Sequence, residues 1–277
     1  MQTRQVTRGD IDAVFDLLSR RPAENLFLAA RLLDSDLDPA RLGHDLWGCW
    51  RDGALAGVCH AGEGAIVPVA DDAEVCVALA DTLGRRRWAG SIMGASDAVL
   101  GLYAELVRRS ASSWGHPRNI RRTQPLMELT HAPRGPVDPR VRRVTLDDFD
   151  AYFDASVKMY TEEIGTSPLG PGSGYASFVR RRISSGYAFG WIEDGRVLFK
   201  TDIGPAAGVL CQIQGVWLDP SLRGQGLAGP AVAQAVEFCQ QMFPVVTLYV
   251  NGFNTPAIRT YERLGFRTIG TMSTVHY

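Results

Sequence analysis

The chain has 277 residues, 45% of them hydrophobic, and a formal net charge of −1 at pH 7. This length allows one large domain or two small ones with a real hydrophobic core, so we expect a folded protein. Because 29 basic residues are balanced by 30 acidic ones, no broad positive field would attract a nucleic-acid backbone. We therefore expect no nucleic-acid partner.

The start of the chain, MQTRQVTRGDIDAVFDLL, lacks the apolar core of a signal peptide, and no run is long enough to span a membrane. The five cysteines are odd in number and form no C-x-x-C pair, which argues against a disulfide framework and against a zinc site. These features predict a cytoplasmic protein with reduced thiols, no membrane partner and no metal.

The chain repeats itself. Residues 4–16, RQVTRGDIDAVFD, match residues 142–154, RRVTLDDFDAYFD, at eight positions. Each copy predicts a short strand, a threonine that caps the next helix, and then the helix itself. Further on, the Asp-Gly turn that follows Trp50 has a counterpart after Trp191, and each predicts a hairpin between two strands.

A linker separates the copies. Residues 131–140, HAPRGPVDPR, contain three prolines and a glycine, a composition typical of linkers. We therefore expect two tandem domains of one architecture, over residues 1–131 and 140–277, with a boundary near residue 135.

The second copy predicts an α/β fold whose central sheet is mixed but mostly antiparallel, with helices on both faces. Its predicted elements, in chain order, are a strand and a helix, a polar loop over 158–174, a helix over 175–184, strands over 186–194, 196–204 and 208–220, a helix over 228–242, a strand over 244–251, a helix from Pro256 and a last strand over 266–277.

A glycine-rich loop precedes the helix over 228–242. Gly224, Gly226 and Gly229 spell G-x-G-x-x-G, the pattern of a dinucleotide-binding turn. Such a turn needs its first glycine directly at the strand end and an acidic residue about 20 positions on. Here the strand ends near Leu218, and Asn251 stands at the end of the next strand. An NAD-dependent oxidoreductase is therefore the weaker alternative.

Taken as R-x-x-G-x-A, residues 223–228 instead resemble the coenzyme loop of the GCN5-related N-acetyltransferases, the GNAT family. The resemblance covers the order of elements from about 140 to 277. It is strengthened by the run VNGFNTPA at 250–257, which is followed by Tyr261 and by Leu-Gly-Phe at 264–266, and this fits the family's second motif.

The resemblance implies that acetyl-CoA is the cofactor, used as a co-substrate. Backbone N–H groups of a glycine turn at the positive end of a helix dipole suit its pyrophosphate. Gly215 in the preceding strand suggests a bulge that opens the strand edge to the pantetheine arm, although a plain packing glycine is the alternative. The implied cofactor-binding residues are Val216, Trp217, Leu218, Arg223, Gly224, Gln225, Gly226, Leu227, Ala228, Asn254 and Tyr261.

The implied reaction is direct attack of a primary amine on the thioester, with both substrates bound. Tyr261 would protonate the departing thiolate, and a backbone N–H near Val216 or Trp217 would polarise the carbonyl. Glu162 and Glu163, expected in the loop between the first two helices, are the candidates for the base, and Glu163 is favoured. Non-catalytic alternatives stay open: Tyr261 could be a buried aromatic residue of the core, and the glutamates could belong to a solvated helix end.

Asn254 also has a purely structural alternative, since it could be the N-cap of the following helix.

The first copy lacks the glycine loop and carries acidic residues at 71, 72 and 74 in its place. We expect it to be a degenerate domain, in a layout similar to that of tandem acetyltransferases such as mycothiol synthase. The acceptor is a small-molecule or peptide amine, and a pseudoenzyme that binds acyl-CoA without transfer is the alternative function.

Overall fold

The computed structural model describes residues 1–62, 64–170 and 174–277. By their contacts these residues form two compact units. The first comprises Met1–Met127 with the segments Tyr249–Asn254 and Thr268–Tyr277, and the second comprises Glu128–Leu248 with Thr255–Arg267. None of the described helices is both long enough and apolar enough to cross a membrane.

The sheet of the first unit has the strand order β1-β2-β3-β4-β5-β12-β6. Its strands are β1 (Gln2–Gln5), β2 (Asp45–Arg51), β3 (Ala54–Ala61), β4 (Ile66–Ala70), β5 (Ser91–Ala95), β6 (Asn119–Leu129) and β12 (Arg267–His276). Its helices are α1 (Ile11–Ser19), α2 (Leu26–Asp34), α3 (Ala73–Leu83), α4 (Ser96–Arg109) and α5 (Ala111–Trp114), with 3-10 turns η1 (Arg8–Asp10) and η2 (Pro39–Leu42).

The second unit has the strand order β11-β10-β9-β8-β7. The strands are β7 (Val141–Arg143), β8 (Ala188–Glu193), β9 (Arg196–Ala207), β10 (Leu210–Leu218) and β11 (Val245–Tyr249). The helices are α6 (Phe149–Ile164), α7 (Tyr175–Ser184), α8 (Ala228–Gln240) and α9 (Thr255–Leu264), with 3-10 turns η3 (Leu146–Asp148) and η4 (Pro220–Leu222). The predicted fold class, a mostly antiparallel sheet flanked by helices, is confirmed.

The predicted threonine caps are present in both copies, but each caps the 3-10 turn that leads into the helix, and the N-cap residues of the helices are Asp10 and Asp148. The carboxylate of Asp10 accepts hydrogen bonds from the backbone N–H and the hydroxyl of Thr7, and that of Asp148 does the same for Thr145. Each threonine and aspartate form a capping box at the start of a 3-10 turn. The repeated sequence thus produces the same local structure twice.

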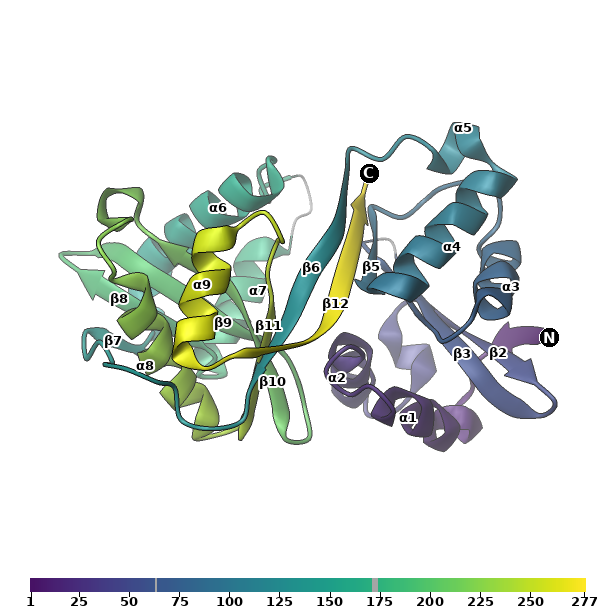
Figure 1. The fold of residues 1–277 in the computed structure, drawn as a ribbon, viewed down its shortest axis with the longest axis horizontal. Coiled ribbons are helices and arrows are strands. Elements are labelled where there is room, and N and C mark those ends of the chain that lie inside the picture. Colours follow the sequence, from purple (N-terminus) through teal and green to yellow (C-terminus); the bar gives the residue numbers. More distant parts are fainter. Residues whose placement is uncertain (63, 171–173) are drawn as a thin grey trace. The chain divides into compact units, whose positions relative to one another are not determined.

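In the second unit, helices cover both faces of the sheet (Figure 1). Neighbouring residues of a strand point to opposite faces. Ala188 of β8 belongs to a buried cluster with Tyr152 of α6 and Val179 of α7. The next residue, Phe189, stacks on Phe238 of α8 with ring centroids 5.6 Å apart. Helices α6 and α7 therefore cover one face, and α8 covers the other.

The sequence predicted that the last strand completes the sheet of the second copy, and this prediction is wrong. β12 pairs antiparallel with β5 of the first unit, from Met272 opposite Ala95 to His276 opposite Ser91. Val275 is fully buried in that unit's core. An alternating apolar strand specifies that it must be paired, but it does not specify its partner. The ranges 1–131 and 140–277 remain a prediction about the extent of the two copies.

A second correction concerns the loop predicted over 158–174. Helix α6 continues to Ile164 and ends at Gly165, which has the left-handed conformation (φ 81°) that glycine adopts at helix C-termini. Glu162 and Glu163 therefore lie in the last turn of α6 and not in a loop. The helix fixes their backbone, so the two side chains leave the helix in different directions.

The burial of Val275 predicts where the C-terminal strand contributes stability. Val275→Ala removes two buried methyl groups and should lower the free energy of unfolding by about 2 kcal/mol. Amide exchange of β5, measured by mass spectrometry, should accelerate, while β9 and β10 keep their protection. Val209→Ala, at a residue 56% exposed, is the matched control. Unchanged exchange in β5 would contradict the pairing.

Candidate active site

The centre of the candidate site is an irregularity in β10. Its parallel ladder with β11 extends only from Leu210 opposite Val245 to Gln212 opposite Thr247, although β10 continues beyond that point. Its register with β9 shifts between Gln214 and Trp217. Gly215, inside this shift, has a φ of 59°. The bulge predicted at Gly215 is confirmed, and beyond it the edge of β10 that faced β11 is no longer in the ladder.

A side chain at position 215 has no room. A Cβ added to Gly215 would lie 2.9 Å from Met159 Cε, 3.2 Å from Lys200 Nζ and 3.4 Å from Asp202 Oδ2. The positive φ adds a backbone penalty for any other residue. Glycine is therefore required here both by conformation and by its neighbours.

The glycine loop forms a backbone cradle at the start of α8. Gly224 and Gly226 have φ values of 77° and 76°, and a Cβ at either position would project into open space. Within the described part of the chain, no backbone acceptor is recorded for the N–H groups of residues 224–227. Consecutive unpaired N–H groups at the positive end of a 13-residue helix make a site for an anion. The cradle fits a pyrophosphate.

Arg223, at the head of this loop, is held by Glu162. Its Nη1 and Nη2 donate to the two carboxylate oxygens at 2.5 and 2.9 Å, and its Nε donates to the carbonyl of Leu218 at 2.9 Å. Trp217 Nε1 donates to the same carboxylate at 3.0 Å. The Arg223 contact, followed by that of Trp217, lowers the pKa of Glu162. Glu162 therefore stays ionised and links the end of α6 to β10 and to the loop.

Glu163 acts on different groups from its neighbour. Tyr261 of α9 is 6% exposed and packs edge-on against Phe266. Burial raises the pKa of the Tyr261 hydroxyl well above its ordinary value, and the negative charge of Glu163 adds to this effect. The same charge contributes to the raised pKa of Tyr175 in α7, where burial is the main cause. Burial and the charge of Glu163 thus both favour the protonated form of the Tyr261 phenol at neutral pH.

The other predicted loop residues frame the cradle. Val216 is half-buried on β10 beside the bulge. Gln225 folds back, and its amide donates to the carbonyl of Ser221 at 3.0 Å. Leu227 is the N-cap residue of α8, and Ala228 is the first residue of the helix. The bulged strand, the turn η4, the cradle and the start of α8 thus follow one another in the chain.

Asn254 lies directly before α9 and is exposed. Its contacts place it in the first unit, where its N–H donates to the carbonyl of Asn251 at 2.8 Å. In the same loop, the N–H of Gly252 donates to the carbonyl of Thr123 at 2.9 Å, and a Cβ there would lie 2.7 Å from that oxygen. The loop therefore needs glycine at 252 because two backbone segments approach closely.

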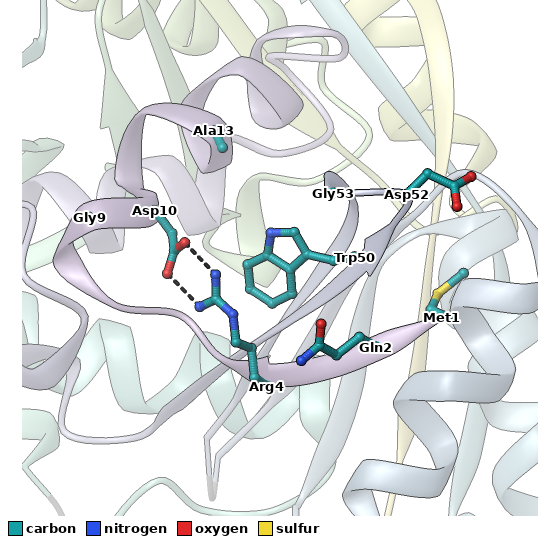
Figure 2. A pocket seen from close by; sticks show the side chains of 9 residues that line it. All are labelled: Met1, Gln2, Arg4, Gly9, Asp10, Ala13, Trp50, Asp52 and Gly53. Atoms are coloured by element: carbon teal, nitrogen blue, oxygen red, sulfur yellow. Dashed lines mark hydrogen bonds and ion pairs between the residues drawn. The ribbon is translucent and has the colours of Figure 1, made fainter.

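A surface hollow of about 700 Å³ lies in the first unit, lined in part by Arg4, Asp10 and Trp50 (Figure 2). The guanidinium of Arg4 covers the Trp50 ring at 3.8 Å and pairs with Asp10 at 2.7 Å. Arg142 and Asp148 form the same pair in the second copy. We therefore interpret the ion pair in this hollow as part of the repeated scaffold.

The sequence analysis missed a buried ion pair at the bulge. Lys200 is fully buried, and its Nζ donates to Asp202 Oδ2 at 2.7 Å. Tyr152 donates its hydroxyl to the other carboxylate oxygen at 2.6 Å. A signal was present, because Lys200 is one of only two lysines in the chain and stands in an apolar strand with an aspartate two residues on. Residues two apart in a strand share a face.

Comparisons with known proteins agree with this geometry. Residues 177–266 match the acetyltransferase (GNAT) family, and residues 44–152 match a domain of unknown function (DUF4081). The chain is 30% identical over 146 residues to the "uncharacterized N-acetyltransferase YjgM" of Escherichia coli (strain K12), covering 48% of this chain and 85% of that protein.

Two solved structures have the same fold over nearly the whole chain. A GCN5-related N-acetyltransferase from Sphaerobacter thermophilus matches with a TM-score of 0.64 and 14% identity, covering 99% of this chain and 95% of that one. A tandem GNAT protein from the clavulanic acid biosynthesis pathway matches with a TM-score of 0.59 and 13% identity, covering 99% and 98%. The chain belongs to the GNAT family of acetyltransferases and is an N-acetyltransferase.

Proposed function

We propose that this enzyme transfers an acetyl group from acetyl-CoA to a primary amine of a small molecule or peptide, by direct attack in a ternary complex. The observation that carries the proposal is the cradle at Gly224 and Gly226, which lies between the bulged strand β10 and the start of α8. The cysteines of the protein are buried free thiols, which fit the reducing conditions of the cytoplasm, and we place the reaction there.

The binding half of the proposal uses backbone groups. The N–H groups of residues 224–228 would hold the pyrophosphate, and the edge of β10 beyond Gln212 would pair with the amides of the pantetheine arm. Arg223 would contribute through its long-range charge and through the order that its pairing with Glu162 gives to the loop. Trp217 shares that carboxylate and fixes β10 to the end of α6.

In the chemical half, acetyl-CoA supplies the thioester. A backbone N–H at Val216 or Trp217 would donate to the carbonyl oxygen, where negative charge develops on attack. Glu163 would accept the proton that the ammonium loses, directly or through water. Tyr261 would donate its hydroxyl proton to the thiolate sulfur as the C–S bond breaks. The raised pKa of Tyr261 keeps that proton available at neutral pH.

The first copy provides no second coenzyme site in this proposal. At the position of the glycine loop, Asp72 caps α3, and its carboxylate accepts the N–H of Val75 at 3.0 Å. The same carboxylate pairs with Arg51 at 2.8 Å. A helix N-terminus already occupied by its own carboxylate repels a phosphate.

The dinucleotide alternative is not favoured by this geometry. A Rossmann turn follows a strand that lies within a parallel sheet. Here β10, which leads into the glycine loop, is antiparallel to β9 on one side and parallel to β11 for only three residue pairs on the other. NADH is therefore the natural negative control in a binding experiment.

Calorimetric titration tests the cofactor. The protein should bind acetyl-CoA in preference to NADH, and Gly226→Asp should weaken acetyl-CoA binding by more than about tenfold, because a carboxylate in the cradle repels the pyrophosphate. Gly195→Asp is the matched control, since Gly195 has a similar φ of 70° in the β8–β9 hairpin with open space around it. Equal losses in both variants would mean that backbone strain, and not phosphate binding, explains the effect.

Substitution of Tyr261 tests the acid. Tyr261→Phe removes only the hydroxyl and should lower kcat by about 100-fold, because loss of general-acid catalysis has this size. The KM for acetyl-CoA should stay within about twofold, since the phenol ring remains. Tyr187→Phe serves as the control, because Tyr187 packs edge-on against Phe243 and has no proposed role in the reaction. A kcat that survives in Tyr261→Phe would remove the hydroxyl from the mechanism.

A pH profile tests the base. Glu163→Gln should leave the affinity for acetyl-CoA unchanged and flatten the rise of kcat/KM with pH, because that rise reports ionisation of the group that accepts the proton. In Glu162→Gln the rising limb should persist, since Glu162 is bound by Arg223 and Trp217. If the profile of Glu163→Gln matches that of the unsubstituted enzyme, the assignment is wrong.

A further inference from the structure

An ion pair is buried against the backbone on which the proposed reaction depends. Lys200 has no exposed surface and Asp202 is 7% exposed. The two side chains project from the same face of β9 and meet at 2.7 Å. Tyr152 of α6 completes the cluster, since its hydroxyl donates to Asp202 and its ring lies 5.0 Å from the ammonium.

The cluster lies under the bulge itself. In the β9–β10 ladder, Lys200 stands opposite Trp217 and Asp202 stands opposite Gln214. Between these two pairs, Gly215 and Val216 of β10 face the single residue Thr201 of β9. Both Nζ and Oδ2 lie within 3.4 Å of the place where a Cβ of Gly215 would be. Between them, Thr201 donates its hydroxyl to the carbonyl of Gln214 at 3.0 Å. Three consecutive residues of β9 thus lie close to the bulge, and Thr201 hydrogen-bonds to its backbone.

A gain in stability alone does not explain why this ion pair is buried. Taking two charges out of water costs several kcal/mol per ion, and apolar residues of similar volume often stabilise a core as well or better. A buried pair with a defined geometry does, however, fix the position of whatever packs on it. The backbone that packs on this pair includes Gly215 and leads directly to the N–H groups of Val216 and Trp217.

We propose that Lys200 and Asp202 are positioning residues for acetyl transfer: their ion pair sets the bulge of β10 so that the backbone N–H at Val216 or Trp217 faces the thioester carbonyl. This inference rests on the proposed function, because it assigns a purpose to the bulge in that reaction. The pair touches neither substrate. It acts through the backbone of Gly215, which has no side chain to keep the charged groups away.

The test compares Lys200→Met, the double variant Lys200→Met/Asp202→Asn, and Arg142→Met as a control. Arg142 forms an exposed ion pair with Asp148 in the same unit and is not in the site. Steady-state kinetics give kcat and the KM for acetyl-CoA, thermal denaturation gives Tm, and amide NMR gives the shifts of Gly215 and Val216. The double variant keeps the shape of the cluster without leaving an unpaired buried charge.

The expected result is a split between kcat and KM. In both Lys200 variants kcat should fall by roughly 100-fold, the loss expected when a catalytic group is misplaced by about 1 Å. The KM for acetyl-CoA should stay within about twofold, because the cradle at residues 224–227 is untouched. The double variant should regain Tm relative to Lys200→Met without regaining kcat, and the amide signals of Gly215 and Val216 should shift in both.

Two results would overturn the inference. One is a double variant that regains kcat together with Tm, since the pair would then serve only stability. The other is unchanged amide signals at Gly215 and Val216. Failure of the proposed function would look different: the unsubstituted protein would neither bind acetyl-CoA nor transfer acetyl to amines, while the amide shifts would still report whether the pair sets the bulge.

Discussion

The candidate site depends on one backbone conformation, the left-handed turn at Gly215 in β10. It interrupts the register with β9 and lies just beyond the last paired residues of β10 and β11. Pairing with the pantetheine arm and polarisation of the thioester carbonyl, as proposed, both need this interruption, because the N–H groups of a regular strand are hydrogen-bonded to its neighbours. Met159, Lys200 and Asp202 surround the position of a Cβ at Gly215, and no side chain larger than hydrogen fits there.

A second constraint joins the end of α6 to the glycine loop. Gly165 ends α6 two residues after the second of the two adjacent glutamates, and the helical geometry turns them to different partners. Glu162 binds Arg223 and Trp217, whereas the charge of Glu163 reaches Tyr261. One carboxylate therefore has a structural role and the other is left to act on the buried phenol. Two identical residues receive different roles from their environments alone.

The two copies share a local scaffold but not the glycine loop. The two copies make the same capping box and the same ion pair, with Arg142 and Asp148 repeating Arg4 and Asp10. The glycine loop is not repeated, since Asp72 caps α3 at the corresponding position of the first copy. Local folding signals and binding chemistry thus reside in different residues and can change independently.

The sequence by itself determined the family, the order of elements, the caps, the bulge and the glycine cradle, because each depends on residues close together in the chain. It also named Glu163 and Tyr261, although only as candidates. Tertiary structure alone decided that Glu162 binds Arg223, that β12 pairs with β5, and that Lys200 and Asp202 lie under Gly215. These contacts join distant residues, and a local pattern specifies that a charge or a strand edge needs a partner without specifying which one.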